Sequence, residues 1–434
     1  MEDGGRECAA RDRFPSGGWY FTPYHARMHR RRVGFFLLIF FFLSLAPFAE
    51  AQRRRSVSAT GTLIIGGLFS LTGDGSTLGR ASEAALQLAA RDINAELQVM
   101  RLPFRVQAVV VDTELKPDPS KLQALYDAGS RFVIGPQSSA EAGALLPFAN
   151  EHHMVVISQG STAFSLAIPN DYLFRLAPND RLEGAAMAGV MRADGIDVAV
   201  PVWRNDSGNT GLRDGAMQFF QAAGGIVSGG IPYAPTTTDF TAIIASLGNA
   251  VRAAKNERPN AHVAVYIAAF EEGVELFNLA RLDADLASVR WYGGDGLTQS
   301  EALLRDPAIA AFAAATSFTT PSVGLGETTR DRWEPLSEEI RAQVGFLPDA
   351  FSLSVYDAAW AATLAHIESH GEDDLRREAF ARTAQRYWGV TGPLALDAAG
   401  DRKIADFDFW TAKDTGTKID WVRTGQYVSG RVVR

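Results

Sequence analysis

The sequence alternates short, continuously apolar runs with amphipathic helical segments from Thr62 onward, and this alternation restricts the possible folds more than any other feature. Apolar runs occupy residues 104–112, 131–135 and 154–158, and a helical pattern closed by glycine, 119–129, lies between the first two. Continuous apolar strands separated by helices indicate a parallel sheet that is covered on both faces.

The alternation begins again after about residue 179, with apolar runs at 197–203, 262–268 and 289–294. The sequence therefore predicts an α/β protein built of two doubly wound parallel-sheet lobes. No low-complexity linker separates the two patterns, and this favours a central cleft that is spanned by short crossovers.

The N-terminal segment has the features of a secretory signal. An apolar run at 35–46 follows three arginines and leads to an Ala-x-Ala motif that ends at Ala51. We predict a leader of residues 1–51 with the true translation start at Met28, and the Arg31–Arg32 pair leaves the export route open. The run is shorter than the roughly 20 residues that span a bilayer, which argues against an uncleaved membrane anchor.

The composition after the leader excludes several classes of partner. Residues 1–51 contain seven of the 42 basic and five of the 50 acidic side chains, so 35 and 45 remain and the net charge is about −10. This charge argues against nucleic acid or anionic lipid as a partner. The single cysteine, Cys8, lies within the leader, so the remaining chain has neither a disulfide nor a cysteine for a lipid anchor. We expect a freely soluble exported protein that does not insert into the membrane after cleavage.

The first loop at a strand end contains Gly73, Gly75 and Gly79, and ligands of open parallel sheets bind beyond the carboxyl ends of strands. The spacing is G-x-G-x-x-x-G rather than the dinucleotide G-x-G-x-x-G, and no lysine follows Gly79 as a phosphate-binding loop requires. The alternative is conformational, because glycines permit tight turns. We therefore expect no nucleotide cofactor.

Hydroxyl side chains stand at the ends of two neighbouring strands. Ser138 and Ser139 precede a helix, and Gly160, Ser161 and Thr162 follow the next apolar run. The serines are suited either to cap the helix or, with the N–H groups at its start, to bind a carboxylate. Gly160 would allow a ligand to approach the backbone closely. Two such loops could hold one carboxylate without an arginine.

An acidic residue stands at the corresponding place in the second half of the chain. Asp295 lies between glycines at a strand end, in WYGGDGL. It is either an ordinary turn residue or a carboxylate that faces the two hydroxyl loops across the cleft. In the second case the site would suit a zwitterion with a carboxylate at one end and an ammonium at the other, which is the backbone of an amino acid.

Signatures of enzymes and of metal sites are weak. No G-x-S-x-G nucleophile elbow stands at a strand–helix turn. His366 and His370 have the i, i+4 spacing of a helical metal pair, but no third ligand is evident in the sequence. We predict neither catalysis, nor a bound metal, nor a cofactor.

Several segments, taken as a set and in order, resemble the periplasmic substrate-binding proteins of branched-chain amino acid ABC transporters. This is the leucine/isoleucine/valine-binding protein family, which has the type I periplasmic binding fold. The segments cover nearly the whole chain after the leader, and they are GLFSLTGDGSTLGRASEAALQLAARDIN, RFVIGPQSSAEAGALLPFANEHHMVVISQGST, YLFRLAPND, TTTDFTAIIASL, WYGGDGL and VTGPLALDAAGDRKIADFDFW.

The resemblance implies two α/β lobes that are joined by three crossovers and close on a ligand. On this pattern the N-terminal lobe comprises 60–178 and 318–393, and the C-terminal lobe comprises 179–317 and 394–434. A helical pattern at 350–370 would therefore return to the N-terminal lobe.

The resemblance also implies roles for single residues. Ser139 falls where the family binds the ligand's α-carboxylate, and Gly160 falls where a backbone group contacts the ligand. Thr162 falls on a threonine whose hydroxyl binds the ligand's backbone groups. Asp295 takes the place of a glutamate that faces the α-ammonium, and Leu78 takes the place of an aromatic wall residue.

Two departures from the family pattern concern the side-chain pocket. The family has a tyrosine where this sequence has Gly208, and another where it has Ala269 beside Phe270. The ligand is therefore not confined to leucine, isoleucine or valine. The predicted ligand-binding residues are Leu78, Ser138, Ser139, Gly160, Ser161, Thr162, Gly208, Phe270 and Asp295.

These observations predict a periplasmic solute-binding protein that delivers an amino acid, or a related amide or carboxylate, to the permease and ATPase subunits of an ABC importer. A ligand-sensing receptor component would use the same clamp with a different partner. A hydrolase or dehydrogenase on a doubly wound fold is the remaining alternative, and the missing nucleophile elbow and imperfect glycine pattern argue against it.

Overall fold

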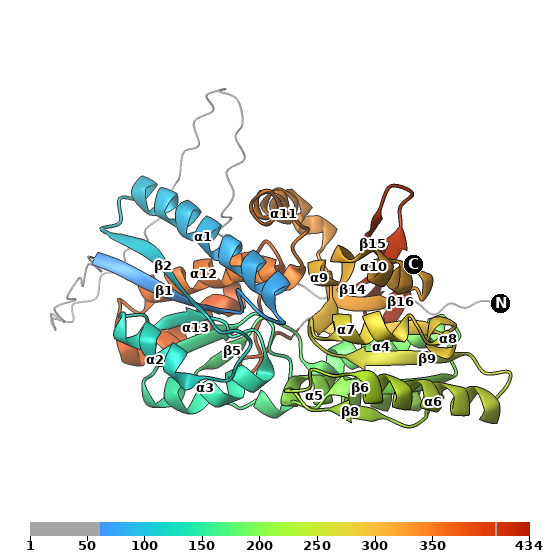
Figure 1. Ribbon diagram of the computed structural model, residues 1–434. Helices are drawn as coiled ribbons and strands as arrows, with labels where there is room; N and C mark the ends of the chain where they lie inside the picture. The colour runs from blue at the N-terminus through green and yellow to red at the C-terminus, as the bar shows by residue number, and fades with distance from the viewer. Residues whose placement is uncertain (1–60, 404–405) are drawn as a thin grey trace, which may run out of the picture.

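The computed structural model describes residues 61–403 and 406–434, and the predicted leader with its start at Met28 lies outside them. The described residues form two α/β lobes, each built on its own sheet, which lie side by side (Figure 1). The predicted fold class is confirmed, because each lobe has a largely parallel sheet with helices on both faces.

The first lobe contains a five-stranded parallel sheet in the order β2-β1-β3-β4-β5. Neighbouring residues point to opposite faces of a strand, so Phe132 packs under α1 while Val133 packs over α2 and α3. The elements before the first crossover are β1 (Gly61–Phe69), α1 (Ser76–Val99), β2 (Phe104–Asp112), α2 (Pro119–Asp127), β3 (Phe132–Ile134), α3 (Ser139–Glu151), β4 (Val155–Ser158), the 3₁₀ helix η1 (Phe164–Leu166) and β5 (Leu173–Arg175).

Three later helices complete the first lobe. Helices α11 (Arg330–Val344), α12 (Ala350–Glu368) and α13 (Arg376–Arg386) pack with α1 over one face of its sheet. Helix α12 is buried around most of its circumference, which explains why its sequence is apolar without a helical stripe. The short elements nearby are the 3₁₀ helices η3 (Glu327–Thr329) and η4 (Asp373–Leu375) and the strand pair β12 (Trp388–Gly389) and β13 (Gly392–Pro393).

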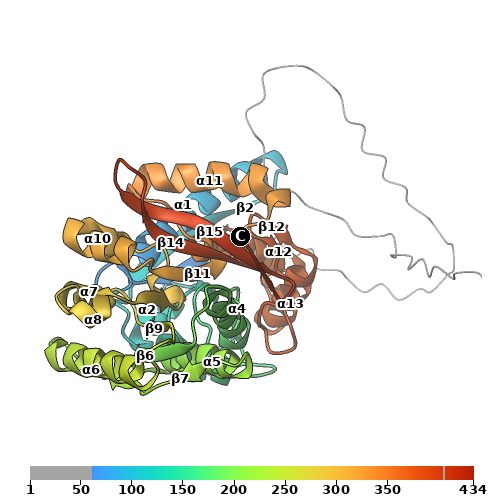
Figure 2. The same ribbon diagram turned by 90° about the vertical axis from the view of Figure 1, so that its right-hand side faces the viewer.

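The second lobe contains a nine-stranded sheet whose centre, β11-β10-β9-β6, is parallel. Strands β14, β15 and β16 extend it antiparallel beyond β11, as Figure 2 shows. The strands are β6 (Val198–Arg204), β7 (Ile226–Val227), β8 (Ile231–Tyr233), β9 (Val263–Ala268), β10 (Arg290–Gly293), β11 (Thr319–Val323), β14 (Phe407–Asp414), β15 (Ile419–Val428) and β16 (Arg431–Val433).

Helices cover both faces of this sheet as well. Helices α4 and α5 pack on one face, and α6, α7 and α10 pack on the other. The helices of this lobe are α4 (Asp180–Ala193), α5 (Ser207–Ala222), α6 (Thr241–Glu257), α7 (Gly273–Ala280), α8 (Ala284–Ala287), the 3₁₀ helix η2 (Asp295–Leu297), α9 (Glu301–Arg305) and α10 (Pro307–Ala315).

The chain passes between the lobes three times, and two of the passages differ from the expected boundaries. Strand β11 pairs with β10 and β14, so the second passage follows Val323 instead of preceding residue 318. The third passage follows Arg402 instead of residue 393, because Asp401 still pairs with Arg175 of β5. The buried Arg175 guanidinium donates to both Asp401 carboxylate oxygens, at 2.6 and 2.5 Å, and holds this segment to the first lobe.

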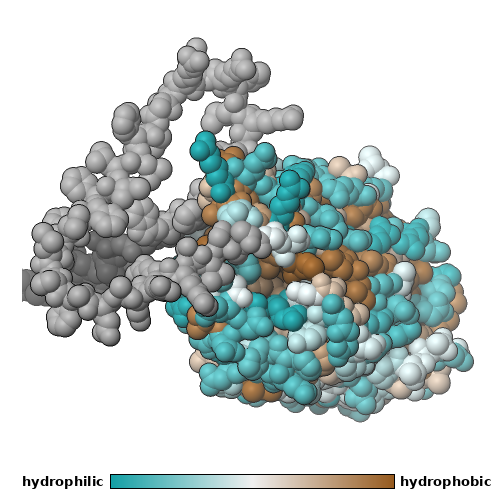
Figure 3. Space-filling view, turned by 90° about the vertical axis from the view of Figure 1, so that its left-hand side faces the viewer, coloured by the Kyte–Doolittle hydropathy of each residue, from teal (hydrophilic) through white to brown (hydrophobic). Residues whose placement is uncertain are grey.

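The surface at the far end of the first lobe is mostly hydrophilic with one hydrophobic band (Figure 3). Strand β2 forms the edge of the sheet in this lobe, and residues 108–111 are only partly buried there. None of the helices in the described residues is both long enough and apolar enough to cross a membrane.

Candidate ligand site between the two lobes

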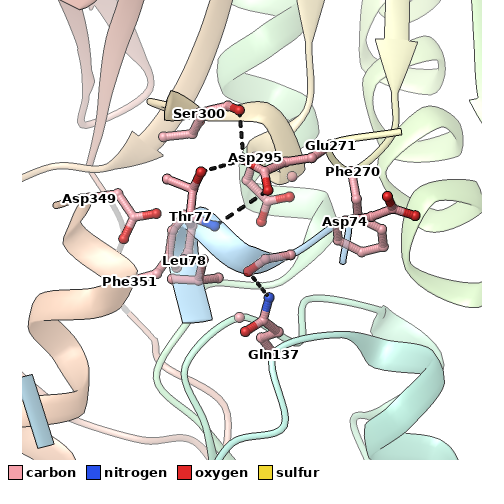
Figure 4. Close-up of a pocket in the computed structure, with 14 residues that line it drawn as sticks. Asp74, Thr77, Leu78, Gln137, Phe270, Glu271, Asp295, Ser300, Asp349 and Phe351 are labelled. Atoms are coloured by element: carbon pink, nitrogen blue, oxygen red, sulfur yellow. Dashed lines mark hydrogen bonds between the residues drawn. The ribbon is translucent and has the colours of Figure 1, made fainter. Parts of the chain in front are cut away.

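A cavity of about 40 Å³ lies where the strand-end loops of the two lobes meet (Figure 4). The first lobe lines it with Asp74, Gly75, Thr77, Leu78, Gln137, Gly160, Asp349 and Phe351. The second lobe lines it with Phe270, Glu271, Asp295, Gly296, Thr298 and Ser300. This is the edge at which the carboxyl ends of parallel strands present loops to ligands.

A larger groove of about 460 Å³ runs between α9, α10 and β15 on one side and the end of α11 on the other. It carries charged side chains of both signs, including Arg305, Arg341, Glu301 and Asp420. It lies away from the strand ends of the first sheet, so position in the fold, and not size, marks the smaller cavity as the candidate site.

Four of the nine residues predicted to bind a ligand line the cavity: Leu78, Gly160, Phe270 and Asp295. The other five do not line it, and they are Ser138, Ser139, Ser161, Thr162 and Gly208. A role in binding stays a prediction for all nine.

Ser138 caps helix α3. Its backbone N–H donates to the Glu141 carboxylate at 3.1 Å, and its hydroxyl accepts from the Glu141 N–H at 3.3 Å. This is the reciprocal arrangement of a capping box, one of the two roles that the sequence left open.

Ser139 ties the two hydroxyl loops together. Its hydroxyl oxygen accepts from the N–H groups of Thr162 and Ala163, at 3.2 and 3.1 Å, and lies 3.1 Å from the Ser161 hydroxyl. Gly208, at the start of α5 in the other lobe, approaches Ser139 so closely that an added Cβ would lie 3.5 Å from its side chain. These residues form the wall behind Gly160.

The glycines of the first loop serve close packing. A Cβ at Gly79 would lie 1.8 Å from the Ser70 carbonyl oxygen, and one at Gly75 would lie 2.2 Å from the Gln137 amide nitrogen. Gln137 holds this loop, because it accepts from the Ser70 N–H at 3.2 Å and donates to the Gly75 carbonyl at 2.9 Å. The expected turn conformation occurs at Gly73, whose φ is 76°, whereas Gly75 and Gly79 are required by close packing.

Asp295 begins η2, directly beyond β10, and lies against two buried acids of α4. Its N–H donates to the Glu183 carboxylate at 3.2 Å. Burial, together with the charge of Asp180, raises the pKa of Asp295 to about 7. Burial also raises the pKa of Glu183 well above its ordinary value and that of Asp180 to about 7. The second lobe thus presents a cluster of carboxyl groups that hold protons unusually tightly.

Asp349 is a second buried carboxyl group at the cavity, and sequence reasoning missed it. It caps α12 by accepting from the N–H and the hydroxyl of Ser352, at 2.7 and 2.8 Å, both at Oδ1. Burial raises its pKa to about 6. The Asp before an apolar helix signals a cap in the sequence, but its position at the cavity depends on where α12 packs.

Glu271, which sequence reasoning also missed, crosses from the second lobe to the start of α1. Its carboxylate accepts from the Ser76 hydroxyl at 3.2 Å, from the Thr77 N–H at 3.4 Å and from the Thr77 hydroxyl. Helix α1 has no side-chain cap of its own and no acidic residue in its first turn. A carboxylate is favourable at a helix N-terminus, so the second lobe supplies the missing cap.

One basic group outside the cavity lining contacts two of the lining residues, Asp74 and Phe270. Arg204 lies 2.9 Å from Asp206, 3.5 Å from Glu272 and 3.8 Å from Asp74, and it stacks 5.5 Å from the centre of the Phe270 ring. Its charge is therefore shared among three acids.

Of the two histidines with helical spacing in the sequence, only His366 lies on α12, because the helix ends at Glu368 and His370 has a positive φ of 54°. His366 lies edge-on to Phe104, with ring centres 5.4 Å apart, and burial lowers its pKa to about 4. The described residues contain no group of three or more potential metal ligands.

Comparisons with known proteins give one consistent result. The model of a family described as periplasmic binding protein matches residues 62–417. An uncharacterized protein of Methanocaldococcus jannaschii is 26% identical over 391 residues, which cover 85% of this chain and 91% of that protein.

Two solved structures share the fold across most of their length. A leucine-binding protein, LivK, of Thermotoga maritima has a TM-score of 0.67 at 18% identity and covers 86% of this chain and 99% of its own. A solute-binding protein of an ABC transporter from R. palustris, in complex with benzoate, has a TM-score of 0.69 at 19% identity and covers 86% and 98%.

Proposed function

The chain belongs to the periplasmic binding protein family, and from this premise we propose that it is the exported solute-binding component of an ABC importer. In this proposal it captures an amino acid, or a related amide or carboxylate, by closing its two lobes. The family consists of solute-binding proteins and not of enzymes, and it works with permease and ATPase components. Export rests on the predicted leader.

The proposal rests on one observation. The cavity at the strand ends is lined by loops of both lobes. A solute that touches both lobes stabilises the closed form in proportion to its differential affinity for closed and open forms. Such a site captures and releases by closure, and it needs no bond to be made or broken.

The proposal gives each predicted residue a role. Asp295 accepts N–H groups of the solute, Gly160 contacts it through the backbone, and Leu78 and Phe270 cover its apolar part. Ser139, Ser161, Thr162 and Gly208 support these groups by holding the loop around Gly160 in place, and Ser138 fixes the start of α3 beside them.

The proposal is tested by a thermal-shift screen of the mature chain against amino acids, amides and aromatic acids. The fold is shared with a leucine-binding protein and with a protein solved with benzoate, so these two solutes open the screen. A solute that binds only the folded state increases the free energy of unfolding, by about 2.7 kcal/mol when its concentration is 100 times its Kd. The melting temperature therefore rises.

Small-angle scattering on each hit provides the second measurement. A decrease in the radius of gyration on binding would support capture by closure. If no solute of the three classes shifts the melting temperature, the proposal fails.

A further inference from the structure

The cavity is lined by acids and by no base. Its charged lining residues are Asp74, Glu271, Asp295 and Asp349, and no arginine, lysine or histidine of the described residues lines it. Two of these acids have partners, because Asp74 lies 3.8 Å from Arg204 and Glu271 accepts the hydrogen bonds described above.

Asp295 and Asp349 have no basic partner among the described residues, although Asp349 accepts the two Ser352 hydrogen bonds at Oδ1. Neither takes part in an ion pair within the described residues, and only acids and uncharged groups surround them at close range. Figure 4 shows the Asp349 side chain directed from the start of α12 toward the middle of the site, where Asp295 enters from the other lobe. A carboxyl group withdrawn from water either keeps its proton or is paired with a positive group. Asp349 is buried and Asp295 is half-buried, so a positive group that enters the cavity from outside the chain would pair them when they lose their protons.

Each side chain of the lining that can donate a hydrogen bond already makes one. The hydroxyls of Thr77 and Ser300 donate to Glu271, and the Thr298 hydroxyl donates to the Pro321 carbonyl. The Gln137 amide donates to the Gly75 carbonyl. A carboxylate in this cavity would meet acceptors on two sides, and among the described lining side chains only Gln137 retains a donor, the second N–H of its amide.

The hydroxyl groups that could have bound a carboxylate, on the loops at 138–139 and 161–162, do not line the cavity. Ser139 lies behind the lining, and its hydroxyl oxygen already accepts two backbone N–H groups. Both lobes therefore offer the solute mainly hydrogen-bond acceptors, which are the carboxyl oxygens of the lining acids.

We propose that the solute is a compact cation without a carboxylate, such as the amide of an amino acid, whose ammonium N–H groups bridge Asp295 of the second lobe and Asp349 of the first. This inference rests on the proposed function and narrows its solute class. Asp349 becomes a specificity-determining residue, because it supplies the second negative charge from the lobe opposite to Asp295.

The test is calorimetric titration of the mature chain at pH 7.5 with matched pairs of an amino acid and its amide. The pairs are glycine with glycinamide, alanine with alaninamide, and leucine with leucinamide. Within a pair the size is nearly equal and only the carboxylate is removed. We expect at least one amide to bind more than tenfold more tightly than its parent amino acid.

The variant Asp349→Asn keeps an oxygen that can cap α12, so it is expected to fold. It should weaken binding of the preferred amide roughly ten- to hundredfold, the loss expected for a hydrogen bond to a charged group. It should also reduce the preference for the amide over the amino acid, which a purely structural role would leave unchanged. Asp331→Asn, at an exposed position on α11, is the matched control and should bind as the wild type does.

The outcomes separate the two proposals. Tighter binding of the parent amino acids, or of benzoate, overturns the cation inference and leaves the proposed function intact. An unchanged preference in Asp349→Asn overturns the role of Asp349. Absence of binding by every solute, together with a negative thermal-shift screen, overturns both proposals.

Discussion

At the scale of single residues, the buried Asp349 and the half-buried Asp295 make the stability of the solute-free protein depend on pH. Asp295 faces Glu183, Asp180 and Asp349, and the pKa values of Asp295 and Asp349 are raised to about 7 and about 6 by burial. A raised folded-state pKa means that the folded state holds the proton more tightly than the unfolded chain. The stabilisation is complete below the unfolded pKa near 3.8 and is lost as pH rises through the folded value.

Replacing Asp349 by Asn should therefore stabilise the solute-free protein at pH 8. The gain is at most about 3 kcal/mol, because the pKa is raised by about two units and each unit corresponds to about 1.4 kcal/mol. At pH 4 the wild-type group already holds its proton, so the two proteins should melt alike. Differential scanning fluorimetry across this range measures the effect, and an equal difference in melting temperature at both pH values would contradict it.

Asp295→Ala should weaken solute binding by about 1.5–3 kcal/mol, the usual value of a hydrogen bond to a charged group. The proposed role places this carboxyl in direct contact with the N–H groups of the solute. Calorimetry on the best hit of the screen gives the measurement, and Asp331→Ala provides the control. An affinity equal to that of the wild type would count against any role of Asp295 in recognition.

At the scale of elements, helix α1 is fixed to its loop by a contact that only glycine permits. Gly79 lies in the first turns of α1, and an added Cβ would meet the Ser70 carbonyl oxygen at 1.8 Å. Gly79→Ala should destabilise the protein by more than about 2 kcal/mol despite the better helix propensity of alanine. Gly143→Ala, within α3, is the matched control, because its Cβ would lie 3.6 Å from the nearest atom, Cδ2 of Leu166, which is an ordinary contact. Similar unfolding midpoints in urea for the two variants would refute the packing argument.

The same scale shows which features the sequence could predict. The strands were predictable because continuous apolar runs mark strands buried on both faces, and Gly160 and Asp295 reach the cavity because they closely follow such strands. Leu78 lies in the first turn of α1, and only the family resemblance placed it at the site. Asp349 and Glu271 were not predictable, since their places depend on long-range packing. Asp349 reads locally as a helix cap, and only the packing of α12 against α1 brings it to the site.

At the scale of the whole molecule, the lobes are connected by contacts that do not involve a solute. The Glu271 N–H donates to the Asp74 carbonyl at 2.9 Å, and the Glu301 N–H donates to the Thr77 hydroxyl at 3.3 Å. Together with the Glu271 carboxylate at the start of α1, these bonds favour the closed arrangement before any solute arrives. The lobes close about a hinge that is formed by the three passages of the chain. The equilibrium between the open and closed forms is therefore shifted toward the closed form without solute, and solute contacts shift it further.

Removing this bias should open the molecule in the absence of solute. In Glu271→Gln the negative charge at the N-terminus of α1 is lost, which weakens the closed form by about 1–2 kcal/mol. The apparent Kd rises in inverse proportion to the closed fraction, so about tenfold weaker binding is expected where that fraction falls to a tenth.

Glu271 lines the cavity, so a change in affinity alone would not distinguish an effect on closure from the loss of a contact with the solute. Scattering without solute makes this distinction. The radius of gyration should increase in Glu271→Gln and stay unchanged in Glu301→Gln, whose side chain pairs only with Arg305. Identical solute-free scattering of both variants and the wild type would show that Glu271 does not hold the lobes together.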